Sequence, residues 1–191
     1  MSLEQATKVG RSLLGTSRAP ARTTSMSPSV HIASFGLPQI DVEIHAPAFD
    51  DHTSREAFFA SSMSGHMVEL ESHDPDLIAA RSRAAGVRLF RDQTIRSRRL
   101  IQLDPELLGI RFQVIGRARA GRPLSGSDGG QIGGLVVACD DPKLAAVLAG
   151  AIFDAPVEHD VVQLRGCPVR FVSVRAAGGV RGLAQIHLAT L

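Results

Sequence analysis

Two short stretches combine carboxylates and a histidine in the same alternating pattern, DVEIH at residues 41–45 and ELESH at residues 69–73. Alternate residues of a β-strand face one side of a sheet, so each stretch would present two acids and one imidazole together. If the two strands were neighbours, these groups would suit a divalent metal ion. The candidate ligands are Asp41, Glu43, His45, Glu69, Glu71 and His73. Alternation alone favours the simpler interpretation, that these are the water-facing sides of two amphipathic strands.

Arginines gather in the part of the chain that follows these acids. Residues 39–76 hold nine acids against one arginine, whereas residues 77–122 hold eleven arginines against three acids. Guanidinium groups pair with carboxylates or phosphates, and like charges directly opposite in a sheet destabilise it. We therefore expect an arginine face to meet the acids of the same chain, another subunit or a polyanion. The predicted interaction residues are Arg88, Arg91, Arg96, Arg98, Arg99, Arg111, Arg117 and Arg119.

Signatures of nucleophilic catalysis are weak. Cys139 and Cys167 have histidines elsewhere in the chain, His159 and His187, but no recognisable catalytic motif surrounds them. The stretch SGSDG at 125–129 lacks the first glycine of a nucleophile elbow, and it precedes a strand instead of a helix. The glycine-rich loop around it lacks the Gly-Lys-Ser/Thr of a phosphate-binding loop. We predict no catalytic residue and no cofactor.

The composition is that of an ordinary globular protein. The chain has 191 residues, of which 44% are apolar and 21% charged, and it contains no Trp or Tyr. The lack of these rings argues against stacking platforms for bases or sugars. No apolar run is long enough to span a bilayer, and no export signal is apparent at the N-terminus. We expect a cytoplasmic protein whose two cysteines are buried free thiols.

A repeated stretch indicates how the chain is built. HDPDLIAA at 73–80 follows the strand-like MVELES, and DDPKLAAV at 140–147 follows LVVAC. In both stretches an Asp is placed to cap a helix that opens with Pro. In the second helix, the apolar residues Leu144, Val147, Leu148, Ala151 and Ile152 predict a one-sided apolar stripe.

Strands surround these two helices. The predicted strands are 30–35, 39–45, 66–72, 87–91, 95–103, 109–119, 135–139, 160–165, 168–175 and 180–188, with a capping box at 53–56 opening a further short helix. The glycines of AAGG at 176–179 suit a tight hairpin. The fold class is therefore α+β, predominantly antiparallel β with few short helices, as two similar β-α-β-β-β units that share a core.

The predicted domains are an extended N-terminal arm (1–29), a first β-rich unit (30–120), a Gly-rich connector (121–134) and a second unit (135–191). These features favour a non-catalytic assembly subunit of a homo- or hetero-oligomer, which associates through the arginine face and the arm. The first alternative is a protein that binds nucleic acid or another polyanion through arginines. A metal protein or enzyme built on the acid/His strands is a weaker alternative.

Overall fold

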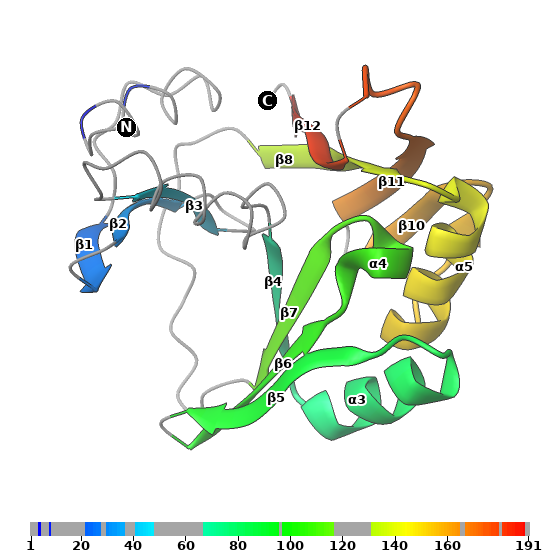
Figure 1. Ribbon diagram of the computed structural model, residues 1–191, viewed down its shortest axis with the longest axis horizontal. Coiled ribbons are helices and arrows are strands. Elements are labelled where there is room, and N and C mark those ends of the chain that lie inside the picture. The colour runs from blue at the N-terminus through cyan, green and yellow to red at the C-terminus, as the bar shows by residue number, and fades with distance from the viewer. Residues whose placement is uncertain are drawn as a thin grey trace. The chain divides into compact units, whose positions relative to one another are not determined.

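The computed structural model describes the following parts of the chain: Glu4, Lys8 and residues 22–27, 30–36, 41–47, 67–95, 97–116, 131–164, 167–179 and 181–189 (Figure 1). Contacts divide the chain into two compact units. One comprises Met1–Gly65, Arg122–Gly133 and Leu188–Leu191, and the other comprises His66–Gly121 and Gly134–His187. We call the second the main unit, and its two segments the first half and the second half. These units are defined by contacts within the chain and do not test the domain boundaries expected from the sequence, which stay predictions.

The three strands near the N-terminus form one antiparallel sheet. They are β1 (Arg22–Ser27), β2 (Val30–Gly36) and β3 (Asp41–Pro47), in the order β1-β2-β3. The strands β2 and β3 lie close to the predicted ranges 30–35 and 39–45. β1 falls inside the predicted arm and pairs with β2 of its own chain. The arm therefore gives no support of its own to association with a neighbouring subunit.

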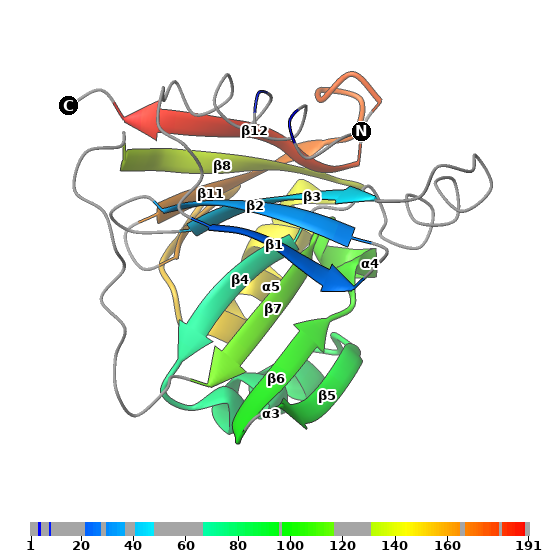
Figure 2. The same cartoon turned by 90° about the vertical axis from the view of Figure 1, so that its left-hand side faces the viewer.

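The first half of the main unit is a four-stranded mixed sheet with two helices. Its elements are β4 (Met67–Ser72), α3 (Pro75–Ala84), β5 (Leu89–Ile95), β6 (Arg98–Leu103), α4 (Pro105–Leu108) and β7 (Arg111–Gly116). The strand order is β4-β7-β6-β5, and Figure 2 shows these strands side by side. β4 and β7 are parallel, and the other two pairs are antiparallel.

The second half repeats this order of pairing. Its elements are β8 (Gln131–Cys139), α5 (Pro142–Phe153), β9 (Val157–Glu158), β10 (Val161–Leu164), β11 (Cys167–Ser173) and β12 (Gly182–Ala189). The sheet runs β12-β8-β11-β10-β9, with β8 and β11 parallel and β10 antiparallel to β9 and β11. The α+β, mostly β fold class is confirmed. Internal duplication stays a prediction.

The Asp-Pro signals mark the starts of both longer helices, as predicted. The Asp74 carboxylate accepts a hydrogen bond from the Leu77 N–H at 2.9 Å, and the Asp141 carboxylate accepts one from the Leu144 N–H at 3.0 Å. Each cap satisfies a backbone N–H that the first helical turn leaves without an intrahelical partner.

The apolar stripe predicted for α5 is only partly correct, because Leu148 and Ile152 are buried but Leu144, Val147 and Ala151 are exposed. Leu144 is 42% exposed and Val147 58% exposed, while Ala145, Ala149 and Ile152 are fully buried. The buried residues are spaced at i, i+4 and i+7, so they also form one face of a helix. Because nearly every position of α5 is apolar, periodicity did not reveal which face packs inward.

The turns also differ from the prediction at two places. The predicted strand 95–103 is interrupted by a tight turn, where Ser97 has a φ of 64°, and β6 begins only at Arg98. The turn at 176–179 does not make a hairpin, because β8 lies between β11 and β12. The capping box at 53–56 and most of the Gly-rich connector lie outside the described residues.

The two halves share one core. The Phe112 ring of β7 lies 5.2 Å from the Phe153 ring of α5, measured between centroids. Gly109, after α4, lies directly against Ala138 and Cys139 of β8. α5 contacts both α3 and α4. The helical face of the first-half sheet is thus packed against α3 of its own half and α5 of the second half.

Candidate protein-interaction site

The four-stranded sheet of the first half has one apolar face and one mixed face. Val68, Ile101, Phe112 and Val114 are buried at alternate positions of β4, β6 and β7. α3 packs against β5, β6 and β7. The residues between these positions belong to the opposite face, which carries charged and amide side chains.

A row of polar residues crosses the opposite face in register. Arg91 of β5 pairs with Gln102 of β6, Gln102 with Gln113 of β7, and Gln113 with Glu69 of β4. The Gln113 amide donates to the Glu69 carboxylate, and the Gln102 amide donates to the Gln113 carbonyl oxygen at 2.5 Å. Because a carboxylate only accepts, it fixes the direction of both amides. We call these four residues the polar row.

Burial makes this row structurally demanding. Gln102 is 7% exposed and Gln113 8% exposed. Buried amides cost free energy unless they are hydrogen-bonded, so the two bonds hold β4, β7 and β6 in one register. Sequence reasoning identified Glu69 and Arg91 but missed the two glutamines between them. Their alternation with buried apolar neighbours was the available signal.

Three of the predicted interaction arginines pair with carboxylates of the same chain. Arg88 donates from Nε to Asp104 at 2.8 Å. Arg98 donates to Glu71 at 2.8 Å and to the Gly116 carbonyl oxygen at 2.6 Å. Arg99 pairs with Asp92 at 2.9 Å and also with Asp76. Of the three partners expected for the arginines, which were acids of the same chain, another subunit or a polyanion, these three arginines thus have the first. Arg96, Arg117 and Arg119 lie outside the described residues.

Arg111 and Arg91 form the part of the face where positive charge is least balanced. The Arg111 guanidinium lies over the Phe90 ring, 4.4 Å from its centroid. Its Nε is buried, and among the described residues it has no hydrogen-bond partner. Burial lowers the pKa of Arg111, the nearby Arg91 lowers it further, and Asp104 opposes this. Arg91 is exposed, and no described carboxylate pairs with it.

Asp104 is the nearest compensating charge. It is 8% exposed and caps α4 by accepting from the Glu106 N–H at 3.0 Å. Burial tends to raise the pKa of Asp104, but the Glu106 N–H, Arg88 and Arg111 together outweigh it and lower the pKa. Asp104 therefore stays ionised at neutral pH. One buried carboxylate shared by two arginines, with Arg91 beside them, leaves an excess of positive charge.

β5 carries this charge, and among the described strands it lies at an edge of its sheet. It is the last strand in the order β4-β7-β6-β5, and Phe90 and Ile95 on it are 53% and 43% exposed. A shallow hollow of about 430 Å³ lies where the chain passes from the end of α3 into β5. The lining residues are Arg83, Gly86, Val87, Arg88, Leu89 and Asp92. We call Phe90, Arg91 and Arg111, together with the β5 edge, the β5 patch.

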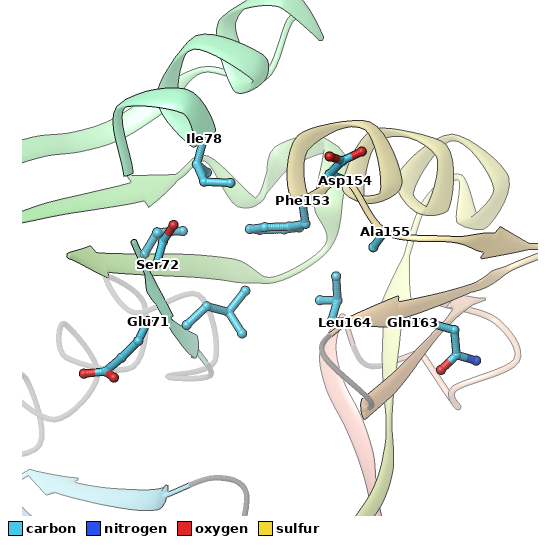
Figure 3. A pocket seen from close by; sticks show the side chains of 10 residues that line it. Glu71, Ser72, Ile78, Phe153, Asp154, Ala155, Gln163 and Leu164 are labelled. Atoms are coloured by element: carbon cyan, nitrogen blue, oxygen red, sulfur yellow. The ribbon is translucent and has the colours of Figure 1, made fainter. Parts of the chain in front are cut away.

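A second cavity, of about 280 Å³, lies between the halves (Figure 3). Ile78, Phe153 and Leu164 point toward one another across it, whereas Glu71 and Gln163 point away. The acids at its rim are already paired, Glu71 with Arg98 and Asp154 with Arg81. Its interior therefore lacks the convergent polar groups that orient a substrate.

The structure does not bring the two acid/His strands together as neighbours in one sheet. β3 belongs to the three-stranded sheet and β4 to the four-stranded sheet. Within the part of the chain that is described, no three His, Cys, Asp or Glu residues are grouped as a metal site. Glu69 and Glu71 instead bond Gln113 and Arg98. The side chains of Asp41, Glu43 and His45 lie outside the described residues.

Burial disfavours the thiolate form of both cysteines. It raises the pKa of the Cys139 thiol to about 11, with a contribution from Asp140, and it raises the pKa of Cys167. Both are free thiols. A nucleophilic cysteine needs a lowered pKa, so these environments oppose that role.

Comparisons with known proteins give no family. No family model and no curated protein matches the sequence. Among solved structures, the chain is similar to the hypothetical protein BH1468 from Bacillus halodurans C-125, with 15% sequence identity and a TM-score of 0.45. That match covers 63% of this chain and 90% of the other. None of the helices described is long and apolar enough to cross a membrane.

Proposed function

We propose that this protein is a non-catalytic assembly subunit that associates with other protein subunits through the β5 patch. The observation that carries this proposal is the contrast among the arginines. Arg88, Arg98 and Arg99 are bonded to acids of their own chain, whereas Arg91 and Arg111 gather beside an exposed Phe90. An apolar ring next to arginine is typical of the residues that dominate protein interfaces.

The repulsion between Arg91 and Arg111 supports this proposal. Two neighbouring guanidinium groups repel each other, and the pKa of Arg111 is lowered by burial and by Arg91. A partner carboxylate at this place would relieve the repulsion between Arg91 and Arg111. A partner carboxylate would therefore bind more favourably at the β5 patch than beside an arginine that is already paired with an acid.

The test compares two charge reversals of exposed strand arginines. Arg91→Glu changes the β5 patch, and Arg170→Glu makes the same change on β11 of the second half. Sedimentation velocity of the purified chain at about 50 mM and 500 mM salt measures association, because exposed ion pairs weaken as the Debye length shortens. We expect a salt-sensitive oligomer that Arg91→Glu weakens by about tenfold or more, while Arg170→Glu leaves it within about threefold.

Two outcomes would overturn the proposal. One is a chain that stays monomeric at every concentration and salt tested. The other is a monomer that retards a single- or double-stranded oligonucleotide with a steep salt dependence lost in Arg91→Glu, which would establish the polyanion-binding alternative.

A further inference from the structure

An open strand edge is a template for another strand. The backbone N–H and C=O groups on the outer side of an edge strand have no neighbour in their own sheet. Among the described strands, β5 is at an edge of the four-stranded sheet, and β3 is at an edge of the three-stranded sheet, where the order is β1-β2-β3. Each edge is thus able to extend the sheet of another molecule.

The register of β5 shows which backbone groups face outward. Ile95 and Arg98 close a hairpin with a two-residue loop, and such a hairpin closes on a hydrogen-bonded pair. Hydrogen-bonded and non-hydrogen-bonded pairs then alternate along an antiparallel ladder. Thr94 and Asp92 are the non-bonded positions, so their N–H and C=O groups point away from β6. These are the groups available to a further strand.

The sequence of β3 matches the charge of this edge. β3 reads DVEIHAP, with acids at Asp41 and Glu43 and no basic residue other than His45. The β5 side carries Arg91, which no described carboxylate pairs with, whereas Arg83 and Arg88 are already paired with Asp92 and Asp104. Asp92 is already engaged by Arg83 and Arg99, so it does not oppose an acidic strand as a free charge would.

We propose that β5 of one copy pairs edge to edge with β3 of a second copy, so that the two sheets become continuous. This inference rests on the proposed function and names its partner, a second copy of this chain. The contact joins two different surfaces, so it is heterologous, and repetition gives a ring or an open filament according to the rotation between copies. Backbone hydrogen bonds supply affinity, and the opposite charges of the two strands restrict pairing to this combination.

β5 has two features that disfavour pairing with an arbitrary strand, a bulge and a charged residue, and both are compatible with pairing to the acidic β3. The register of β5 shifts between Leu89 and Arg91, and the next five residues pair regularly with β6. Charges and bulges on an edge strand discourage hydrophobic edge-to-edge aggregation. A bulge at the start and an arginine within the regular segment leave a short edge that accepts a complementary strand.

The first experiment separates backbone pairing from charge. Thr94→Pro removes an outward N–H without removing a bond to β6, and Thr94→Ala is the matched control that keeps the N–H. We expect Thr94→Pro to weaken self-association by about tenfold or more and Thr94→Ala by less than about threefold. Circular dichroism and thermal unfolding of both variants check that each is folded. In the assembly, amide exchange at Asp92 and Thr94 should slow relative to the dissociated chain.

The second experiment is a charge swap between copies. Arg91→Glu alone and the double variant Asp41→Arg/Glu43→Arg alone should each lose assembly, because like charges would face each other in every possible contact. An equimolar mixture of the two should assemble with an affinity within about threefold of the unmodified chain. In the mixture, every contact between unlike copies has opposite charges.

The outcomes distinguish this inference from the proposed function. If Arg91→Glu abolishes assembly while Thr94→Pro does not and the mixture fails to recover, the β5 patch binds a subunit by side chains and the strand pairing is wrong. If no variant changes association, both proposals fail. Recovery in the mixture together with slowed exchange at Asp92 and Thr94 supports the β5–β3 contact.

Discussion

The two halves of the main unit pair their strands in a similar order, with one more strand, β12, in the second half, but they distribute apolar surface differently. β8 lies between β12 and β11, and all six residues from Gly134 to Cys139 are buried. β4, its counterpart, is an edge strand in which only Val68 is fully buried. A strand with neighbours on both sides and packing on both faces reads as a continuous apolar run, whereas a half-exposed edge strand alternates.

The helices differ in the same direction. α5 has Lys143 as its only charged residue, and it buries six residues, mainly alanine and leucine or isoleucine. α3 carries Asp76, Arg81 and Arg83, each of which pairs with an opposite charge, and it buries three residues. Both halves nevertheless supply the core, because seven of the twelve largest fully buried side chains among the described residues belong to the first half. The first half differs in that its sheet also has a face of charged and amide side chains.

Matched phenylalanine truncations test this comparison most strongly. Phe171 of β11 is fully buried, and Phe90 of β5 is 53% exposed. We expect Phe171→Ala to lower the free energy of unfolding by about 3–5 kcal/mol, through lost burial and the cavity it leaves. Phe90→Ala should cost less than about 1 kcal/mol, mostly from the contact with Arg111. Urea unfolding followed by circular dichroism measures both, and equal losses would show that the Phe90 ring is packed more tightly than its exposure indicates.

The junction between the halves is tested by two glycines with the same backbone conformation. Gly109 has a φ of 71° and Gly86 a φ of 74°. A Cβ on Gly109 would lie 2.5 Å from the Cys139 Cβ and 2.7 Å from the Ala138 carbonyl oxygen, whereas nothing lies within 4 Å of one on Gly86. Gly86→Ala should therefore cost only the left-handed backbone penalty, about 1 kcal/mol.

Gly109→Ala should cost about 2–4 kcal/mol, because overpacking against β8 adds to the same penalty. The difference between the two variants in urea unfolding isolates the close approach of the halves. A Gly109→Ala loss no greater than that of Gly86→Ala would mean that β8 moves away at little cost, and that the halves are less tightly joined than their shared core indicates.

Local signals in the sequence predicted much of this fold. The caps Asp74 and Asp141, the strands around them and the α+β class follow from residues close together in the chain. α4 was missed, although Asp104-Pro105 repeats the Asp-Pro signal that predicted the other two helices. Four residues are too few for apolar periodicity, so the cap was the only local evidence.

Pairings over long distances were not predictable from local patterns. β12 joins β8 and not β11, because sheet order depends on contacts between segments far apart in the chain. The buried face of α5 is selected by its neighbours, since the helix is apolar all round. For the same reason, the sequence predicted an arginine-rich face but not the partner of each arginine. The structure pairs Arg88, Arg98 and Arg99 with acids. It places Arg91 near Arg111, which lies over the Phe90 ring.

The thiols give the smallest of the expected differences, and they are confined to the second half. Burial and Asp140 raise the pKa of Cys139 from 9.0 to about 11. The unfolded chain therefore loses this proton first as the pH rises, so the free energy of unfolding falls between pH 9 and pH 11 and not below that range. We expect a loss of about 1 kcal/mol between pH 9 and pH 10 from this thiol. Burial also raises the pKa of Cys167, so the contribution of Cys139 has to be isolated by a substitution.

Cys139→Ala is the control, because it removes the titrating group with a small change in volume. The variant should be less stable at neutral pH but lose less stability between pH 9 and pH 10 than the unmodified chain. Urea unfolding at both pH values gives the comparison, and a thiol-reactive probe at pH 8 should label Cys139 far more slowly in the folded chain than in urea. An unchanged pH slope in Cys139→Ala would show that this thiol is not held in a dry interior. In that case β8 would be more open to water than the burial of all six residues from Gly134 to Cys139 indicates.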